Sequence, residues 1–470
     1  MKPVPASTTV NPAICFDQEL VERYGGRGPR YTSYPTALQF SERLTESDYR
    51  SNAIASNASG APLSLYVHIP FCHALCYYCG CNKIVTRNQV RVDRYMEMLH
   101  REIGMQSELF ERERQTRQLH FGGGTPTYLE REQMDTLMAA LRGAFTFDES
   151  DDREFSIEVD PRTVDSDGLR HLSDLGFNRL SLGIQDFDPV VQEAVNRMQS
   201  ADEVSMLVNT ARDTQFKSIS FDLIYGLPHQ NVRSFDATLD IAINMRPDRL
   251  AVYNYAHLPE RFKGQRMINA ADIPSPETKL DILHHTIDRL ADSGYIYIGM
   301  DHFALPEDDL VQARGDGTLQ RNFQGYSTHG ECDLVGLGVS SISSIGNVYA
   351  QSAITTMEYE TLIEDGHLPI RKGIAVDADD LLRAEVIQAL MCYDRLDFDE
   401  FDAAHDIEFR NYFEEEIASL KPLADDDLIE LDADSVTITP KGRLLLRSIA
   451  MVFDRHIDEV GNEKRFSKAI

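Results

Sequence analysis

Short β-rich runs alternate with helix-patterned segments along the middle of this 470-residue chain. The runs with the apolar, β-branched texture of strands are 63–70, 118–121, 154–159, 179–185, 218–224 and 249–255. The segments with helical periodicity between them are 92–113, 131–145, 190–195, 201–215 and 232–245. Strand, crossover helix and strand at intervals of roughly 25–50 residues predict a parallel α/β sheet or barrel.

A doubly wound Rossmann sheet would show the same alternation, but no Gly-x-Gly-x-x-Gly follows the first run. Chemically unusual residues instead fall at or just past the end of each run. In order they are the cysteines after 63–70, then Gly122–Gly124, Glu158, Gln185, Asp222 and Tyr255. This rim is where βα barrels collect substrates and cofactors. Because the units are fewer than the eight of a complete barrel, we expect a partial, TIM-like (β/α)6 barrel.

The texture of the sequence changes on both sides of this barrel. Residues 1–60 lack clear periodicity, and the Gly and Pro residues within 27–35 predict an extended strap rather than a helix. After about residue 360, amphipathic helices over 381–391 and 410–420, a short hairpin around 428–438 and a last helix from Lys441 follow. We therefore expect an N-terminal covering segment over 1–60, the barrel and its extension over 61–360, and a mostly helical, winged-helix-like domain over 361–470.

The chain is strongly acidic, with a formal net charge of -30 and a pI near 4.8. This charge argues against binding to nucleic acid or to anionic lipid, and acidic residues also outnumber basic ones in the C-terminal domain. No apolar stretch approaches the ~20 residues of a membrane helix, and the N-terminus has no apolar signal-peptide core. We expect a cytoplasmic protein, and nothing in the sequence demands an oligomer.

Four of the seven cysteines lie within ten residues of one another. These four are Cys72, Cys76, Cys79 and Cys81. Structural zinc generally uses two separated pairs of ligands, whereas these thiols share one short loop. The spacing alone favours an iron–sulfur cluster and leaves zinc, or no metal, as alternatives. The remaining three, Cys15, Cys332 and Cys392, are isolated, and we interpret them as ordinary thiols.

The Cys-x3-Cys-x2-Cys of this loop, followed after the second strand by Gly-Gly-Gly-Thr-Pro at 122–126, resembles the radical S-adenosylmethionine (SAM) superfamily. The resemblance implies that Cys72, Cys76 and Cys79 hold three irons of a [4Fe–4S] cluster and leave the fourth iron open to SAM. Gly122–Gly124 would let the backbone approach SAM closely. Cys81 as a fourth ligand would close the cluster, so we expect it to approach substrate or SAM instead.

The resemblance narrows over nearly the whole chain to one family, the oxygen-independent coproporphyrinogen III oxidases of bacterial haem biosynthesis. The segments that carry it are 30–36, 79–81, 156–162, 178–187, 222–228, 300–304 and 321–326. It implies oxidative decarboxylation of the ring A and B propionates of coproporphyrinogen III to vinyl groups, giving protoporphyrinogen IX. A haem-trafficking protein of the same fold is the alternative, but such relatives typically lack both the 79–81 extension and the 30–35 segment.

The same resemblance implies roles for individual residues. Cys81 and Tyr66 are the candidate catalytic residues. Glu158, with Tyr66 and Gly122, would contact the cluster-bound SAM. The expected contacts of SAM, including a second SAM beside the first, are Tyr66, Tyr78, Gly122, Gly123, Gly124, Thr125, Glu158, Gln185, Arg197, Asp222, Ala256 and Ile342.

The expected substrate carries four carboxylates, which an acidic protein can hold only with local cations. Arg27 and Arg30 are the candidates, because a guanidinium offers two parallel hydrogen bonds to a carboxylate. The reaction also requires an electron donor to the cluster, which the sequence does not identify.

Overall fold

Six strands of the computed structural model lie parallel in one sheet, and each pairs with the next strand in chain order. They are β1 (Leu63–Ile69), β4 (Gln115–Gly123), β6 (Glu154–Val159), β7 (Arg179–Gln185), β8 (Ser218–Tyr225) and β9 (Arg249–Asn254). All six were predicted from sequence, within a few residues at each end. The partial (β/α)6 barrel is therefore confirmed.

The structure describes residues 14–457, which divide into two compact units. The barrel unit comprises Gln39–Ser275 and Glu331–Val376. The terminal unit comprises the described part of the N-terminus up to Leu38, then Pro276–Gly330, and the chain from Asp377 onward. The sequence-based division into the segments 1–60, 61–360 and 361–470 stays a prediction. No helix among the described residues is long and apolar enough to cross a membrane.

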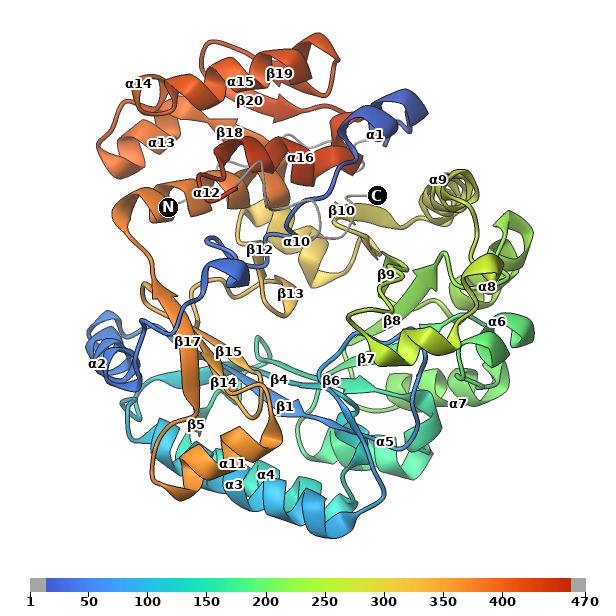
Figure 1. Ribbon diagram of the computed structural model, residues 1–470, viewed down its shortest axis with the longest axis vertical. Helices are drawn as coiled ribbons and strands as arrows, with labels where there is room; N and C mark the ends of the chain where they lie inside the picture. The colour runs from blue at the N-terminus through green and yellow to red at the C-terminus, as the bar shows by residue number, and fades with distance from the viewer. Residues whose placement is uncertain (1–13, 458–470) are drawn as a thin grey trace. The chain divides into compact units, whose positions relative to one another are not determined.

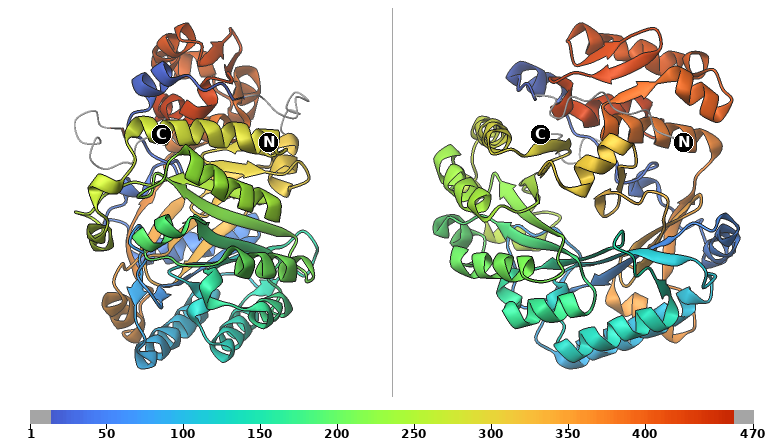
Figure 2. Two further views of the ribbon diagram at one scale, coloured as in Figure 1. Left: turned by 90° about the vertical axis from the view of Figure 1, so that its right-hand side faces the viewer. Right: turned by 180° about the vertical axis from the view of Figure 1, so that it is seen from behind.

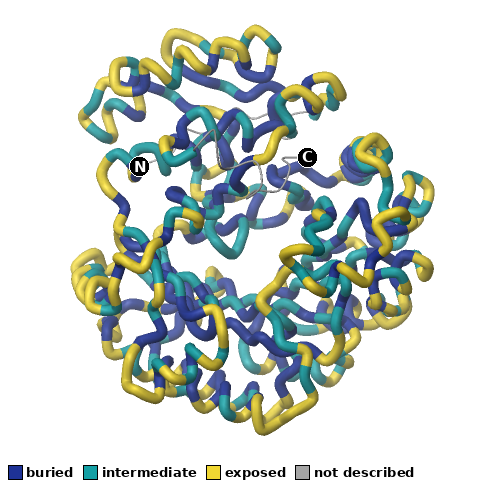
Figure 3. Tube along the Cα trace, in the orientation of Figure 1, coloured by how far each residue is buried: buried dark blue, intermediate teal, exposed yellow. Residues whose placement is uncertain are grey.

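Helices cover the outer face of the barrel sheet, and the strands are the more deeply buried layer (Figures 1 and 3). The helices are α3 (Gln89–Ser107), α4 (Arg131–Ala144), α5 (Ser166–Asp174), α6 (Pro189–Ala194), α7 (Ala201–Arg212) and α8 (Val232–Met245). Several begin with a side-chain cap on free backbone N–H groups, as Ser200 does for α7 and Asn231 for α8. Of these helices, α5 was not among the segments named from sequence.

On its other edge the barrel sheet continues beyond β1. Strand β14 (Asp333–Leu337) pairs parallel to β1, and β15 (Ile342–Ile345), β16 (Val348–Ser352) and β17 (Ile370–Ala375) follow in antiparallel order. Helices α2 (Glu46–Ser56) and α11 (Thr356–Glu364) belong to this part of the unit. β15, which begins with Ile342, therefore lies two strands from β1, the strand that leads into the cysteine loop.

The terminal unit is mostly helical, as expected, and its core is rich in phenylalanine. Its helices are α1 (Gln18–Tyr24), α9 (Pro276–Asp292), α10 (Asp309–Asp316), α12 (Ala378–Tyr393), α13 (Phe398–His405), α14 (Phe409–Tyr412), α15 (Glu414–Asp425) and α16 (Leu446–Ala450). The predicted hairpin is β19 (Ile429–Leu431) and β20 (Ser435–Ile438), joined by β18 (Arg395–Asp397) into a three-stranded sheet (Figure 2). Two further hairpins are β10 (Ile296–Gly299) with β11 (His302–Ala304), and β12 (Gln320–Asn322) with β13 (Gly325–Ser327).

The strap over 27–35 is packed into the core of the terminal unit. Tyr31 and Tyr34 are only 2% and 3% exposed and belong to the phenylalanine-rich core. The Tyr31 hydroxyl donates a hydrogen bond of 3.0 Å to Asp454, and Arg447 donates to the carbonyl of Pro29 at 3.0 Å. Because both rings are buried, they stabilise this unit.

Candidate active site

The cysteine loop connects β1 to α3 and is closed on itself by backbone pairing. Short strands β2 (Phe71–Cys72) and β3 (Ile84–Val85) pair in parallel, so residues 73–83 between them form a tight Ω-like loop. Cys72 and Cys76 are buried, Cys79 is half-buried and Cys81 is exposed. Exposure of the cysteines rises along the loop, and the Cys79 and Cys81 side chains are hydrogen-bonded to each other.

Positive and polar groups surround these thiols. Arg162 Nη2 and Arg197 Nη1 lie 3.5 and 3.6 Å from Cys76 Sγ. The Thr125 hydroxyl lies 3.5 Å from Cys72 Sγ, and Lys83 Nζ donates to the Cys79 carbonyl at 2.9 Å. Cations near a thiolate stabilise its negative charge. The loop is therefore prepared for an anionic thiolate-ligated centre.

The donor set fits a multi-iron cluster better than a single ion. Within residues 14–457, no three His, Cys, Asp or Glu side chains converge as the ligands of one metal ion do. A tetrahedral zinc site holds its sulfurs about 2.3 Å from one point, whereas cubane ligands each bind a different iron and stand farther apart. Soft thiolates gathered on one short loop, without a second Cys/His pair at finger-like spacing, suit such a cluster.

The glycine turn at 122–124 packs directly against the strand that carries the loop. A Cβ on Gly124 would lie 2.7 Å from the Pro70 carbonyl, and one on Gly123 would lie 2.7 Å from the His68 ring. Gly123 also has a φ of +116°, which other residues rarely adopt. The glycines are thus required by the β1–β4 contact itself, in addition to the close approach of a ligand expected from sequence.

Glu158, on β6, is held by hydrogen bonds inside the barrel. The Gly123 N–H donates to Glu158 Oε2 at 3.2 Å, and His120 Nε2 lies 3.2 Å from Oε1. Desolvation alone would raise the pKa of Glu158, but the hydrogen bonds from His120 and Gly123 outweigh it, so the pKa lies below its ordinary value. The residue therefore presents an anionic carboxylate.

Asp222, on β8, behaves in the opposite way. Burial, together with the charge of Glu158, raises the pKa of Asp222 to about 7, although Ser181 hydrogen-bonds to it at 3.1 Å. Two carboxyl groups in one barrel whose environments push their pKa values apart can differ in charge at neutral pH. The pair offers one anion and one group that exchanges a proton near pH 7.

Arg197 and Gln185 lie at the β7 end of the barrel. Arg197 is 6% exposed, pairs with Asp160 at 2.8 Å and donates to the Gly183 carbonyl. Gln185 has a φ of +67°, and its amide folds back toward Gly183, where an added Cβ would lie 2.9 Å from Nε2. Both residues are therefore fixed around the Gly183 backbone, on the side of the barrel that also reaches Cys76.

The remaining candidates of the barrel unit are linked by shared partners. Tyr66 Oη lies 3.0 Å from His68 Nδ1, and its ring stacks on His120 at 5.8 Å. The carbonyls of Tyr78 and Ala256 both accept from Gln265 Nε2, at 2.9 and 3.2 Å. Ile342 is half-buried at the start of β15. Arg27 and Arg30 belong to the terminal unit.

Sequence reasoning missed three residues that organise this site. They are His120, Arg162 and Gln265. Arg162 stood within the family-like segment 156–162, where an Arg after Asp-Pro at a strand end was the available signal. Gln265 gave none, because a glutamine in a loop is usually solvated, and here it is 2% exposed.

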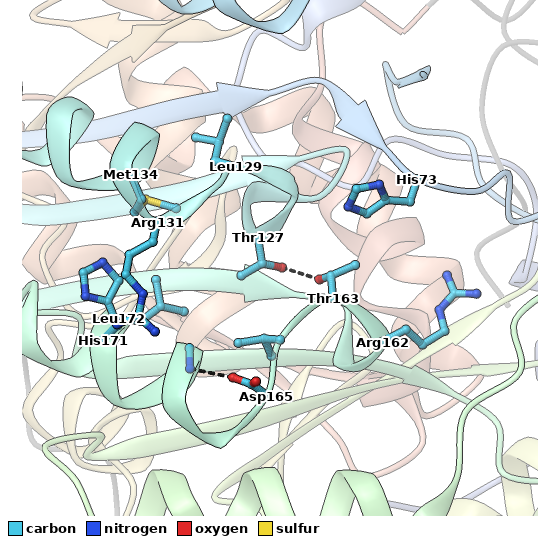
Figure 4. Close-up of a pocket in the computed structure, with 12 residues that line it drawn as sticks. His73, Thr127, Leu129, Arg131, Met134, Arg162, Thr163, Asp165, His171 and Leu172 are labelled. Carbon is cyan, nitrogen blue, oxygen red and sulfur yellow. Dashed lines mark hydrogen bonds between the residues drawn. The ribbon is translucent and has the colours of Figure 1, made fainter. Parts of the chain in front are cut away.

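A pocket of about 520 Å³ lies beside the cysteine loop, in the barrel unit (Figure 4). It is lined by His73, which follows Cys72, by Arg162, and by the starts of α4 and α5. Thr127 and Thr163 hydrogen-bond to each other across its floor at 2.6 Å. None of the expected SAM contacts lines it, so this pocket is separate from the barrel interior.

Comparison with known proteins agrees with this geometry. The Radical SAM superfamily model matches residues 66–242, which include the cysteine loop and Asp222, and the HemN C-terminal domain model matches residues 376–445. The oxygen-independent coproporphyrinogen III oxidase of Pseudomonas aeruginosa is 51% identical over 97% of this chain and 99% of that protein. The Escherichia coli protein of the same name is 49% identical over 97% and 99%.

A solved structure extends the similarity to the fold. It is described as coproporphyrinogen III oxidase (HemN) from Escherichia coli, a radical SAM enzyme, and it aligns with a TM-score of 0.90 and 49% identity. The alignment covers 94% of this chain and 100% of that one. These names favour the oxidase over the haem-trafficking alternative. At such identity over nearly the full length of both proteins, the chain belongs to the oxygen-independent coproporphyrinogen III oxidases of the radical SAM superfamily.

Proposed function

We propose that the barrel unit binds its cluster through Cys72, Cys76 and Cys79 and that the whole chain decarboxylates coproporphyrinogen III. The family is one of radical SAM enzymes of haem biosynthesis that carry a [4Fe–4S] cluster and use SAM. The observation that carries the residue assignment is the closed cysteine loop, with two guanidinium groups at Cys76 and the glycine turn packed beside it. The product is protoporphyrinogen IX, with vinyl groups where the ring A and B propionates stood.

When bound, the cluster and SAM supply a 5′-deoxyadenosyl radical that removes hydrogen from a propionate β-carbon. The protein contributes orientation and electrostatics. Glu158, ionised by its hydrogen bonds, accepts from the amino group or ribose of SAM, and Tyr66 lies in the same polar network. Gly122, Gly123 and Gly124 border this position, since Gly123 is hydrogen-bonded to Glu158 itself.

A second SAM is proposed on the β7–β8 side of the barrel. Gln185, Arg197 and Asp222 would contact it through an amide, a guanidinium and a carboxyl group, which match the carboxylate, amino and hydroxyl groups of SAM. The further proposed SAM contacts are Tyr78, Thr125, Ala256 and Ile342. Gln265 positions two of these by holding the carbonyls of Tyr78 and Ala256.

Cys81 is proposed not to ligate the cluster. Its exposure, in contrast to the buried Cys72 and Cys76, supports a thiol that approaches SAM or substrate. Arg27 and Arg30 are proposed to hold substrate carboxylates from the terminal unit. We further propose a cytoplasmic monomer that receives electrons from a separate donor.

An anaerobic comparison of single variants tests the cluster assignment. Cys72→Ala, Cys76→Ala and Cys79→Ala should each lose the iron–sulfur absorbance and the bound iron, whereas Cys81→Ala should keep both and lose turnover. Should Cys81→Ala lose iron as completely as the other three, the open-iron assignment is wrong. If instead every variant retains the cluster, the loop is not the cluster site.

A further inference from the structure

Three arginines of the terminal unit lie close together with one aspartate, and we call Arg30, Asp301, Arg321 and Arg447 the arginine cluster. Arg321 and Arg447 are 4% and 2% exposed. Burial, and then the charges of Arg30 and Arg321, lower the pKa of Arg447 to about 10, while Asp301 acts in the opposite direction. Arg321 and Arg447 both donate to the backbone of residues 28–30, which brings these guanidinium groups together.

One buried donor of the cluster, Arg321 Nη1, is not used by its hydrogen bonds. Arg30 Nη1 pairs with Asp301 Oδ2 at 3.0 Å, and Arg321 Nε donates to the Arg30 carbonyl at 3.1 Å. Arg447 donates to the carbonyls of Gly28 and Pro29. Within the part of the chain that the structure describes, Arg321 Nη1 is buried and has no hydrogen-bond partner. A buried, unsatisfied donor on a cation is costly unless a further acceptor meets it.

Cations outnumber carboxylates within the cluster as defined. Its side chains are three guanidiniums and one carboxylate, in a chain whose net charge is -30. His302, which lies beside Arg321 and Asp301, adds no charge, because burial and then Arg321 lower its pKa to about 4. Guanidinium groups with a buried donor to spare favour an incoming carboxylate.

Asp301 is placed so that another carboxylate can take over its position. It forms, with Met300, the two-residue turn between β10 and β11, and both residues have positive φ, +73° and +44°. For residues other than glycine, this backbone conformation is strained, and such strain is often found at functional sites. The side chains of Arg30 and Asp301 are 35% and 21% exposed, so the pair is reachable from solvent while Arg321 lies deeper.

We propose that the arginine cluster is a binding site for one propionate of the tetrapyrrole, which displaces Asp301 from Arg30 and meets Arg321 Nη1. The inference rests on the proposed function and deepens it, adding Arg321, Arg447 and Asp301 to the single contact expected from Arg30. Asp301 serves as the built-in carboxylate that neutralises Arg30 until the substrate arrives. The ligand class is an alkyl carboxylate on a large apolar body, and Arg321 and Arg447 set the charge that receives it.

Two variants with opposite expected effects test this site. Coproporphyrin III, the unreactive aromatic form of the substrate, is titrated by calorimetry into the anaerobic holoenzyme. Arg321→Met should weaken binding roughly ten- to a hundredfold, the usual effect of losing one charge-assisted hydrogen bond. Asp301→Asn removes the competing carboxylate and should tighten binding about threefold. A misfolded variant cannot produce that gain, so the pair separates a binding role from a folding defect.

Controls define what each result means. Arg395→Ala, at an arginine of the same unit that is 51% exposed, should bind coproporphyrin III as the wild type does. The tetramethyl ester of coproporphyrin III has no free carboxylates. With both porphyrins dissolved in one detergent, the ester should bind the wild type and Arg321→Met with equal affinity. Unchanged affinity in both Arg321→Met and Asp301→Asn would overturn the arginine cluster as the site. If the wild type itself neither binds coproporphyrin III nor converts coproporphyrinogen III, the proposed function fails instead.

Discussion

The two units surround their buried arginines with different groups. In the barrel unit, Arg162 and Arg197 share Asp160, and both approach the Cys76 thiol. In the terminal unit, Arg30 pairs with Asp301, and among the described residues one N–H of the buried Arg321 has no hydrogen-bond partner. Cations that already meet a thiol suit a cofactor that stays with the enzyme, whereas a spare donor beside an exchangeable carboxylate suits an anionic substrate that comes and goes.

The largest expected effect is loss of the iron–sulfur cluster, which should involve the barrel unit alone. Cys76→Ala removes the thiol that Arg162 and Arg197 both approach, so we expect no cluster absorbance and no 5′-deoxyadenosine. Cys15→Ala, at an exposed thiol of the terminal unit, should change neither. Iron and sulfide analysis of the two anaerobically purified variants checks the difference. Equal iron in both would remove the distinction between the loop and the isolated cysteines.

The next effect breaks the terminal unit alone. Phe409 is fully buried and stacks on Phe398 at 4.5 Å and against Phe413 at 4.6 Å. Phe409→Ala should lower the free energy of unfolding of this unit by about 3–5 kcal/mol. Tyr412→Ala, next to it but 43% exposed, should cost under about 1 kcal/mol. Thermal unfolding measures both, and SAM cleavage without substrate should survive in each.

A pH-dependent effect sharpens the description of the barrel unit. Glu102, on α3, is 1% exposed and accepts hydrogen bonds from the Gly338 N–H at 2.7 Å and the Tyr359 hydroxyl at 2.6 Å. Burial raises its pKa to about 7, above the ~4.3 of an unfolded chain. The folded state therefore binds the extra proton between about pH 4.3 and 7, and this contribution to stability is lost as the pH rises through that window.

Glu102→Gln keeps the two acceptor contacts and removes the titration. Its stability should fall less steeply than the wild type's between about pH 4.3 and 7, and it should exceed the wild type by roughly 1–3 kcal/mol at pH 8. Denaturant unfolding at several pH values measures this. A pH profile identical to that of the wild type would show that Glu102 does not carry the expected proton.

The smallest effect concerns one helix of the barrel. Ser200 and Glu203 form a reciprocal capping box at the start of α7. Ser200→Ala should cost about 1 kcal/mol, and Ser200→Thr, which keeps the hydroxyl, should cost less. Since α7 only covers the sheet, cluster content and SAM affinity should stay unchanged in both. Loss of cluster in Ser200→Ala would mean that the outer helices and the site are more tightly coupled than described.

The barrel strands could be predicted from sequence because each is a short apolar run, and the run itself shows which residues are buried. β1 and β8 are examples. Sequence reasoning missed α5, whose nine residues bury little more than Leu169 and Leu172, and it missed α1 and α2 in the segment without periodicity. α2 is polar and has almost no apolar face, so periodicity could not report it, whereas α5 has an apolar face but spans only nine residues. Helices this short are stabilised by tertiary packing and caps.

The terminal unit was harder to predict from sequence, because its stability depends on contacts between distant parts of the chain. Its three stretches are separated by residues 39–275 and 331–376 of the barrel unit, so contacts such as Tyr31 with Asp454 leave no periodic trace. The cysteine loop and the glycine turn could be predicted, because their chemistry demands particular residue types at fixed spacing. Arg321 and Arg447 could not, since an isolated arginine in a sequence is most often a solvated surface group.

The most direct test of the central claim is an anaerobic assay of the full-length protein with SAM, a reductant and coproporphyrinogen III. Two propionates are decarboxylated to vinyl groups per molecule, so 5′-deoxyadenosine and protoporphyrinogen IX should rise together, with at least two of the former for each of the latter. Omission of SAM should stop both. Formation of protoporphyrinogen IX without SAM, or steady 5′-deoxyadenosine with the tetrapyrrole unchanged, would contradict the assignment.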